Sequence, residues 1–408
     1  MGFFFPSYAR DRSPGEERET LKKEGIRNMK RVISSLLTLA MLLLLAVPAG
    51  AESLAVDAGA CLLMEKTTGQ VLYAVNEHQP LEPASVTKIM TVLLVMEAID
   101  AGTLRYDDVV TASAYACSMG GSQIWLKENE QLTVEDMLKA VCVASANDCS
   151  MALAEHLSGS GEAFVERMNQ RAGELGMNDT HFLNPTGLPA EGHVTSAYDI
   201  ALMSRELILN HPDVRRFTTI WMDTLRNGEF GLNNTNKLIR FYQGATGLKT
   251  GSTDGALYCL SATAERDGME LIAVILKAPT STQRFEGAKT LLNYGFAAYA
   301  LAQAQPPQPL EPIPVELGDA PWVNVRLEGD AAILAAKEKV KAMEVTVELE
   351  EKLSAPVEAG QQVGKMVVTS GGETLSELPL VAEKAVNRLT YWQILERCLQ
   401  TAFMGGRR

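Results

Sequence analysis

The chain has 408 residues, of which 46% are hydrophobic and 21% are charged, and its formal net charge is −13. This composition is ordinary for a globular protein and excludes a disordered chain or a polytopic membrane protein, while the length allows two domains with sizeable cores. The acidic balance argues against nucleic acid as a partner, and no Cys-x-x-Cys or His-containing spacing indicates a metal site.

The first 51 residues contain a predicted signal peptide. Met29-Lys30-Arg31 is a cationic start, an apolar core follows over 32–47, and Ala49-Gly50-Ala51 is a small-residue cleavage site, so we expect export and cleavage after Ala51. The alternative is an uncleaved anchor, for which the apolar core is short. A signal peptide begins near its charged end, and Lys23-Glu24-Gly25 can be encoded by a purine-rich ribosome-binding sequence. We therefore predict that Met29 is the true start.

Residues 52–304 predict one α+β domain. Two β-type runs, 60–65 and 70–74, flank a Gly-containing turn and should form a hairpin. An apolar run that follows Pro83 and Ala84 and is closed by Gly102 predicts one buried helix from about Ser85 to about Ala101. Residues 133–157 have helical period, but the turn-favouring segment 145–148 predicts a break that points polar side chains into a cleft.

The rest of this domain predicts further helices, a loop and a second hairpin. Helices are expected over 162–175, 196–209 and 283–301, and a loop over 182–188. Two β-type runs, 256–264 and 270–278, are separated by Arg266-Asp267-Gly268 as a hairpin turn.

Beyond this domain we predict a stiff Pro-rich linker over 305–312 and a small β-rich domain over 313–382. In the last segment, 383–408, a helical wheel places Leu389, Trp392, Leu395, Leu399 and Phe403 on one face, and basic residues outnumber acidic ones. Such a cationic amphipathic helix fits the surface of an anionic membrane. The alternative is a helix docked on the β-rich domain.

Six cysteines are spread along the chain: Cys61, Cys117, Cys142, Cys149, Cys259 and Cys398. In an exported protein some can form disulfides, but the sequence does not give their pairing. We expect most of them to be buried small hydrophobic residues.

Ser85 and Lys88 lie three residues apart at the start of the predicted buried helix, so both side chains point to the same face. A serine hydroxyl becomes nucleophilic when a base takes its proton, and a lysine can be that base when burial and nearby cations lower its pKa. The helix N-terminus adds free N–H groups that can stabilise an oxyanion. The alternative interpretation is a serine that only caps a helix.

Two further motifs follow in a fixed order. Ser145-Ala146-Asn147 lies 60 residues after Ser85, and Lys249-Thr250-Gly251 lies 104 residues after Ser145. Together with Ser85-x-x-Lys88 they resemble the penicillin-binding proteins and serine β-lactamases. With the segments 81–91, 119–124, 184–188, 246–251 and 355–365, the chain resembles the low-molecular-mass serine-type D-alanyl-D-alanine carboxypeptidases, and within them the DacF type.

The resemblance implies an antiparallel sheet with helices on both faces, a helical subdomain, a small all-β domain and a C-terminal amphipathic helix. It also implies an enzyme at the outer face of the cytoplasmic membrane that removes the terminal D-alanine from the peptidoglycan stem pentapeptide and is acylated by β-lactams. No cofactor or metal is implied. The resemblance does not give the preferred stem peptide, the oligomeric state or the role of the β-rich domain.

By the same resemblance, Ser85 matches the nucleophile, Lys88 its proton acceptor, and Ser145 and Asn147 the pair that relays protons and holds the substrate. Lys249 matches the cationic group of the cleft, Thr250 and Gly251 the strand that pairs with substrate, and Ser85 and Ser252 the N–H groups of the oxyanion hole. Arg284 matches an arginine that approaches the substrate carboxylate; the alternative is a surface arginine at a helix start. Repulsion from Lys249 is expected to lower the pKa of Lys88.

Three other functions remain open from the sequence. A serine β-lactamase uses a glutamate to activate water, and Glu206-x-x-Leu209-Asn210 has the form of such a motif, but it lies inside a predicted apolar helix and 61 residues past Ser145. A DD-endopeptidase differs only in access to the cleft. A non-catalytic penicillin-binding module would keep the cleft without turnover.

Overall fold

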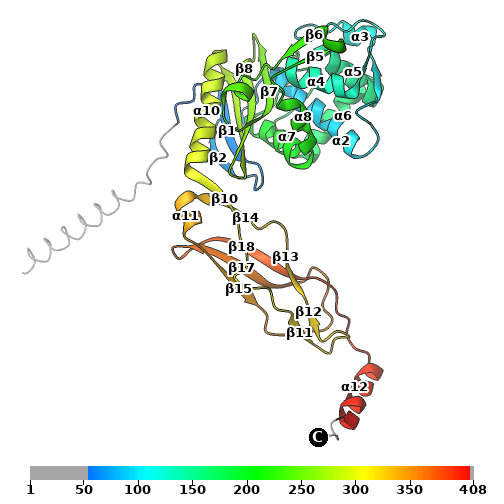
Figure 1. Ribbon diagram of the computed structural model, residues 1–408, viewed down its shortest axis with the longest axis vertical. Helices are drawn as coiled ribbons and strands as arrows, with labels where there is room; N and C mark the ends of the chain where they lie inside the picture. Colours follow the sequence, from blue (N-terminus) through cyan, green and yellow to red (C-terminus); the bar gives the residue numbers. More distant parts are fainter. Residues whose placement is uncertain (1–53, 405–408) are drawn as a thin grey trace, which may run out of the picture. The chain divides into compact units, whose positions relative to one another are not determined.

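The computed structural model describes residues 54–404, and the predicted signal peptide, its cleavage site and the start at Met29 lie outside them. All elements described below belong to one unit, Ala55–Arg408 (Figure 1).

An antiparallel five-stranded sheet has the order β2-β1-β9-β8-β7. Its strands are β1 (Ala60–Glu65), β2 (Val71–Val75), β7 (Ala245–Thr253), β8 (Leu257–Arg266) and β9 (Met269–Ala278). Both predicted hairpins form, and the second has a tighter turn than expected because Arg266 pairs with Met269. The sheet therefore joins strands from the two ends of the predicted α+β domain.

Helices cover both faces of this sheet (Figure 1). Side chains alternate along each strand, so neighbours point to opposite faces. Leu63 and Leu271 reach Gly295 of α10 (Ser281–Ala298), whereas Leu62 and Ile272 join the core cluster on the other side. There α7 (Ala197–Asn210) packs on β1 and β9 and on α2 (Lys88–Asp100).

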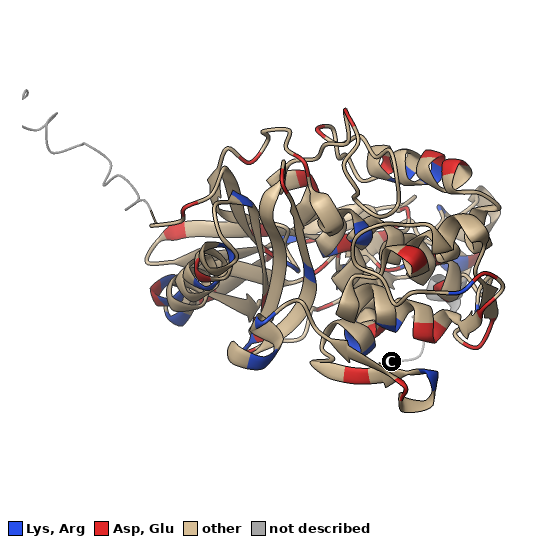
Figure 2. Cartoon of the chain, turned by 90° about the horizontal axis from the view of Figure 1, so that it is seen from above, with Lys and Arg blue, Asp and Glu red and all other residues tan. Residues whose placement is uncertain are grey.

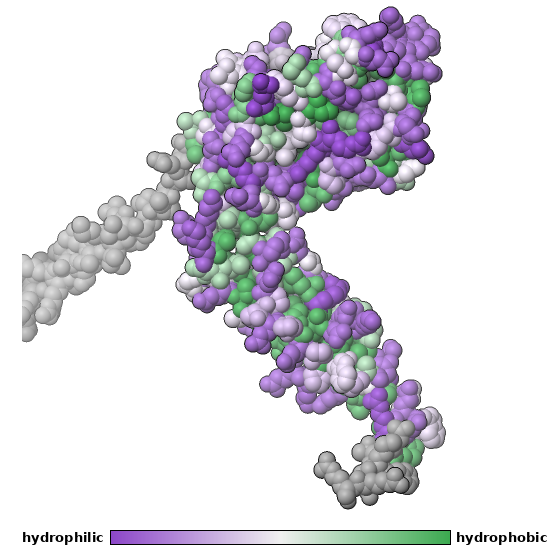
Figure 3. Space-filling view, viewed as in Figure 1, coloured by the Kyte–Doolittle hydropathy of each residue, from purple (hydrophilic) through white to green (hydrophobic). Residues whose placement is uncertain are grey.

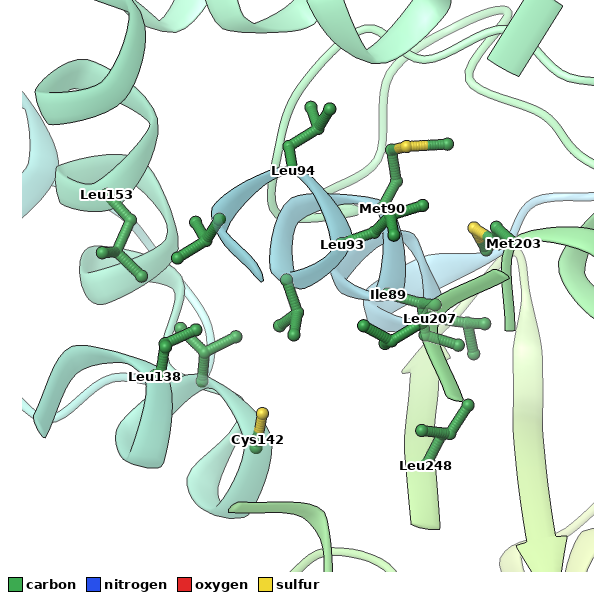
Figure 4. Close-up of a cluster of buried hydrophobic side chains, with 14 of the residues drawn as sticks. Ile89, Met90, Leu93, Leu94, Leu138, Cys142, Leu153, Met203, Leu207 and Leu248 are labelled. Atoms are coloured by element: carbon green, nitrogen blue, oxygen red, sulfur yellow. The ribbon is translucent and has the colours of Figure 1, made fainter. Parts of the chain in front are cut away.

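Helix α2 lies at the centre of the core, where its side chains contact elements from several parts of the chain (Figure 4). Leu138, Leu153, Leu207 and Leu248 surround it, and ten of its thirteen residues are buried. The prediction of one helix from Ser85 to Ala101 was wrong at its start: Ala84–Thr87 form a 3-10 turn, η1, and the α-helix begins at Lys88. Ala84 has a positive φ of 48°, which bends the chain at the start of this turn.

The residues between β2 and β7 are mostly helical. The helices and turns are α3 (Ala114–Cys117), α4 (Val134–Ala144), α5 (Asn147–Ser158), α6 (Gly161–Glu174), η2 (Pro212–Val214), α8 (Arg215–Thr218), η3 (Arg226–Gly228) and α9 (Leu238–Phe241). Two short strand pairs accompany them: β3 (Val109–Thr111) with β4 (Gln131–Thr133), and β5 (Met222–Leu225) with β6 (Phe230–Asn233). The predicted break between α4 and α5 is present, and Ser145 occupies it with a left-handed backbone at φ 64°.

The C-terminal part is almost entirely β-structure. Its strands are β10 (Tyr299–Gln303), β11 (Ile313–Glu316), β12 (Trp322–Val323), β13 (Val325–Leu327), β14 (Ala332–Ala336), β15 (Met343–Leu349), β16 (Leu353–Ser354), β17 (Gln362–Ser370) and β18 (Glu373–Ala382), with one short helix, α11 (Lys337–Lys341). The predicted helix 283–301 ends earlier, because residues from Tyr299 onward pair with β14. Leu310, in the Pro-rich segment, packs against a cluster of this part. The predicted domain boundaries remain a prediction.

The last described helix, α12, covers Tyr391–Met404 and so begins later than the predicted 383. The preceding residues belong to the β-structure, where Val386 pairs with Val357. Trp392 and Leu399 are exposed on α12, and Figure 3 shows hydrophobic next to hydrophilic surface at this end. Within residues 54–404, no helix combines the length and hydropathy needed to cross a membrane. Acidic and basic residues are interspersed over the elements seen in Figure 2.

Candidate active site

Ser85 and Lys88 meet at the junction of η1 and α2, as their spacing predicts. Lys88 Nζ lies 3.0 Å from Ser85 Oγ and donates a hydrogen bond to it. Ser85 is partly exposed, whereas Lys88 is completely buried. A reagent can therefore reach the hydroxyl while the amine remains shielded from water.

The buried position of Lys88 changes its protonation. Burial lowers the pKa of this amine well below its usual range, the charge of Lys249 lowers it further, and the Asp148 carboxylate opposes both effects. The predicted repulsion by Lys249 is present, but desolvation is the larger cause. A neutral amine beside a hydroxyl can accept its proton.

The loop 184–188 fixes the direction of the Lys88 amine. Lys88 Nζ donates a second hydrogen bond, of 2.5 Å, to the carbonyl oxygen of Thr186. Asn184 Oδ1 shapes this loop by accepting the backbone N–H groups of Thr186, Gly187 and Leu188. Gly187 has φ 77°, and a Cβ there would collide with the Ala84 carbonyl. Glycine is therefore required for the loop to approach η1.

His193 connects the same loop region to η1. Its Nδ1 accepts the backbone N–H of Leu183 at 3.0 Å, so its Nε2 carries a proton and donates to Thr87 Oγ1 at 2.8 Å. Burial lowers the pKa of His193 to about 4, helped by nearby His181. His193 is thus neutral near pH 7 and holds the residue directly before Lys88.

Ser145 and Asn147 lie on either side of the α4–α5 break. Asn147 donates from Nδ2 to the carbonyl of Gly120 at 2.6 Å, and its backbone N–H donates to the carbonyl of Ser122 at 2.7 Å. Ser145 Oγ and Asn147 Oδ1 are buried and have no hydrogen-bond partner. Buried polar atoms without a partner are costly and rare. Neither atom has its hydrogen-bonding capacity used within the protein, and Ser145 Oγ makes no hydrogen bond to Ser85 or Lys88.

Strand β7 packs against η1 and carries the third motif. Lys249 is buried and donates to the carbonyl of Thr250 at 2.8 Å, and Thr250 Oγ1 donates to Thr235 Oγ1 at 2.7 Å. Burial lowers the pKa of Lys249 to about 7, with Cys142 opposing this shift. A Cβ at Gly251 would lie 2.9 Å from the Ser85 nitrogen, so β7 passes directly against η1. Ser252, the next residue, is exposed.

Arg284 is not the surface arginine that the sequence left as an alternative. It lies in the first turn of α10, is 8% exposed and donates from Nη1 to the carbonyls of Gly251 at 3.0 Å and Cys259 at 3.3 Å. Its Nε has no partner. Arg284 therefore supports the backbone of β7 from behind.

The Glu206 motif is engaged elsewhere. Glu206 lies within α7, where its carboxylate accepts hydrogen bonds from Arg171 at 2.6 Å and from Asn210 at 2.9 Å.

All six cysteines are free thiols, and four are buried.

Sequence reasoning missed three contributors: the Thr186 carbonyl, His193 and Asp148. Asp148 is fully buried and accepts the backbone N–H groups of Ile124 and Leu126. A carbonyl has no side-chain signal, but the Asn-Pro-Thr-Gly pattern at 184–187 indicates a tight turn. A lone histidine 106 residues after Thr87 gives no indication of its partner.

The chain is similar to known proteins over most of its length. Residues 47–280 match the D-alanyl-D-alanine carboxypeptidase family (peptidase S11), and residues 305–388 match the C-terminal domain of penicillin-binding protein 5. D-alanyl-D-alanine carboxypeptidase DacF of Bacillus subtilis is 40% identical over 91% of this chain and 98% of its own length.

Two solved structures are similar. Penicillin-binding protein 5 of Haemophilus influenzae has a TM-score of 0.75 and 31% identity, covering 83% of this chain and 100% of its own. Penicillin-binding protein D2 of Listeria monocytogenes, in its ampicillin-bound form, has a TM-score of 0.53 and 34% identity, covering 60% of this chain and 99% of its own. The chain therefore belongs to the D-alanyl-D-alanine carboxypeptidase family of low-molecular-mass penicillin-binding proteins.

Proposed function

We propose that Ser85 is the nucleophile with which this serine-type D-alanyl-D-alanine carboxypeptidase removes the terminal D-alanine of the peptidoglycan pentapeptide. The observation that carries the proposal is the 3.0 Å contact between the Ser85 hydroxyl and a fully buried lysine whose pKa is lowered. Few other environments let a lysine serve as a base near neutral pH.

In the acylation step, Ser85 Oγ attacks the carbonyl carbon of the penultimate D-alanine while the neutral Lys88 amine takes the hydroxyl proton. The tetrahedral intermediate then loses the bond between that carbon and the nitrogen of the terminal D-alanine. Ser145, whose hydroxyl is buried and unpartnered, passes a proton to the leaving amine. The products are free D-alanine and an ester on Ser85.

The backbone N–H groups of Ser85 and Ser252 supply the oxyanion hole, since β7 runs against η1 at Gly251. Asn147, with its free Oδ1, receives an N–H of the stem peptide. Lys249 and Thr250 attract the terminal carboxylate, and a bound carboxylate raises the pKa of Lys249 and keeps it charged. Arg284 acts as a positioning residue through the Gly251 carbonyl.

Water then hydrolyses the ester and returns Ser85 and Lys88 to their starting protonation states. The same steps with a β-lactam give a penicilloyl ester on Ser85. Slow release of this ester distinguishes a carboxypeptidase from a β-lactamase, which turns over many equivalents per second.

Mass spectrometry after incubation with penicillin and with a pentapeptide tests the assignment. We expect one penicilloyl group per wild-type chain, none on Ser85→Ala, and release of D-alanine by the wild type alone. Acylation of Ser85 without release of D-alanine would instead indicate a non-catalytic penicillin-binding module. Cleavage of cross-linked dimers at a comparable rate would indicate a DD-endopeptidase.

The chain is also proposed to be exported and held at the outer face of the cytoplasmic membrane by α12. The support is the cationic start and apolar core over 29–47 and the exposure of Tyr391 (73%), Trp392 (74%) and Leu399 (50%) on α12. Exposed aromatic residues on an amphipathic helix insert at the headgroup level of a bilayer.

Flotation with anionic phospholipid vesicles tests this role of α12. Trp392→Glu should abolish flotation, whereas Gln393→Glu, which adds the same charge one residue away and can keep the cap to Thr390, should retain most of it. Truncation after Thr390 removes α12 but keeps Val386, which pairs with Val357. If the truncated chain still floats with the vesicles, α12 is not the anchor.

A further inference from the structure

Trp125 is unusual in both exposure and backbone conformation. Its side chain is 67% exposed, although large aromatic residues ordinarily bury most of their surface. Its φ is 54°, in the left-handed region that bulky residues avoid. Such positions persist only where the surrounding structure enforces them, and they cluster at functional sites.

Two charged side chains enforce the conformation of Trp125. The buried Asp148 carboxylate accepts the backbone N–H groups on either side of it, from Ile124 and Leu126. From the other direction, Arg226 donates to the carbonyl of Ile124 at 2.9 Å and of Trp125 at 3.4 Å. A fully buried carboxylate and an arginine thus fix the backbone that carries an exposed indole.

The same segment leads directly to the proposed active site. Asp148 follows Asn147 in α5, and Asn147 bonds to the carbonyls of Gly120 and Ser122. Only residues 123 and 124 separate Ser122 from Trp125. Trp125 is therefore placed rigidly relative to Asn147, on the same loop.

Trp125 lines a cavity of about 660 Å³ together with Phe230 of β6. The two rings form a T-shaped pair with centroids 5.9 Å apart. Arg226 also lines the cavity, and its guanidinium donates to Glu130 Oε1 at 2.7 Å. The Arg226 guanidinium lies over one face of Phe230, 5.3 Å from the ring centroid, so the Trp125 indole is the more exposed aromatic surface of the cavity. The lining holds two basic and two acidic side chains, Lys127 and Arg226 with Glu128 and Glu130, and therefore has little net charge to attract an acidic peptide.

We propose that Trp125 and Phe230 form a saccharide-binding platform that receives a sugar ring of the glycan chain to which the stem peptide is attached. A pyranose ring presents a row of C–H groups on one face and hydroxyls around its edge, and the C–H face stacks on indole. The platform rests on the proposed function, because it is useful only beside a site that acts on peptidoglycan. It would make glycan-linked stem peptides better substrates than free peptides.

Substrate competition measures this preference. We define the ratio of kcat/KM for uncross-linked pentapeptide on glycan chains to kcat/KM for a sugar-free acyl-D-Ala-D-Ala peptide. Trp125→Ala should lower the ratio about tenfold, the loss expected for one aromatic contact of ordinary strength. Trp125→Phe should lower it less. Trp322→Ala, which removes a tryptophan of similar exposure (61%) from β12, should leave it unchanged.

Binding is measured separately with glycan chains from which all peptides have been removed. These chains should quench the tryptophan fluorescence of the wild type and of Trp322→Ala, but not that of Trp125→Ala. An unchanged ratio in Trp125→Ala, or quenching by free stem peptide and not by peptide-free glycan, overturns the proposal. If the wild type releases no D-alanine from either substrate, the proposed function fails instead, and the glycan titration still reports on the platform.

Discussion

The buried histidine that donates to Thr87 makes a measurable prediction about stability and pH. The His193 imidazole is 3% exposed and must stay neutral, because its Nδ1 accepts the Leu183 N–H while its Nε2 donates to Thr87. Its pKa is about 4 in the folded chain against 6.5 for an ordinary histidine. Between these values the unfolded chain binds a proton that the folded chain does not.

The sign and size of the effect follow from this difference. Stability is fully present above about pH 6.5 and falls as the pH decreases toward 4, where the His193 contribution amounts to a loss of about 3 kcal/mol. His193→Gln can keep a donor toward Thr87 but does not titrate. At pH 7.5 it should be less stable than the wild type by about 1 to 2 kcal/mol, from one impaired buried hydrogen bond. That gap should close or reverse by pH 4.

Urea titrations at intervals between pH 7.5 and pH 4 provide the free energies of unfolding of both proteins. Taking the difference between them cancels the contributions of all groups that the substitution leaves unchanged. His156→Gln is the matched control, because His156 is exposed, and its gap to the wild type should stay constant. A gap for His193→Gln that is equally constant over this range would refute the reasoning.

Three further predictions concern the proposed reaction with penicillin. Because the pKa of Lys249 is about 7, acylation by penicillin should slow as the pH rises above 7 and the amine loses its charge. In stopped-flow measurements of the acylation rate against pH, Lys249→Arg should not show this decline, because arginine stays charged. Identical pH profiles for the two proteins would contradict the prediction. Gly251→Ala should slow acylation by about 5- to 150-fold, since the added Cβ lies 2.9 Å from the Ser85 nitrogen and overpacking costs about 1 to 3 kcal/mol. Gly173→Ala, where a Cβ meets nothing within 4 Å, should label with fluorescent penicillin like the wild type, and equal labelling of both variants would count against the Gly251 contact. Glu206→Gln should leave hydrolysis of the penicilloyl ester unchanged by mass spectrometry, whereas slower release would favour a β-lactamase-type role.

The sequence predicts most elements of the α+β part because their hydrophobic periodicity is clear and turn-forming residues mark their ends. The Ser85–Lys88 contact follows from a spacing of three residues, although the short 3-10 turn that carries Ser85 does not. The sequence predicts that α10 continues to residue 301, but the helix ends at Ala298. The apolar residues around Tyr299 suit a helix as well as a strand, and only their pairing with β14 decides between the two. The hydrophobic periodicity of one segment gives no information about a strand that pairs with it from a distant part of the chain.

The supporting contacts of the site were harder to predict for a related reason. Arg284 contacts the Gly251 carbonyl 33 residues away, and the Lys88 amine contacts a carbonyl 98 residues away. Backbone acceptors have the same chemistry at every position, so their use depends on tertiary placement alone. Desolvation of Lys88 is likewise a property of the packed core, whereas the charge of Lys249 is visible in the sequence.

The position of β7 at the edge of its sheet has a consequence for the range of stem peptides that the enzyme can accept. Within the described residues, β7 is bonded to β8 on one side and to no strand on the other. An open strand margin recognises the main chain of an extended ligand, and the main chain is common to stem peptides that carry different diamino acids. We therefore expect the enzyme to tolerate different third residues of the stem, and to select substrates by the D-configured end, which is proposed to bind near Asn147 and Lys249.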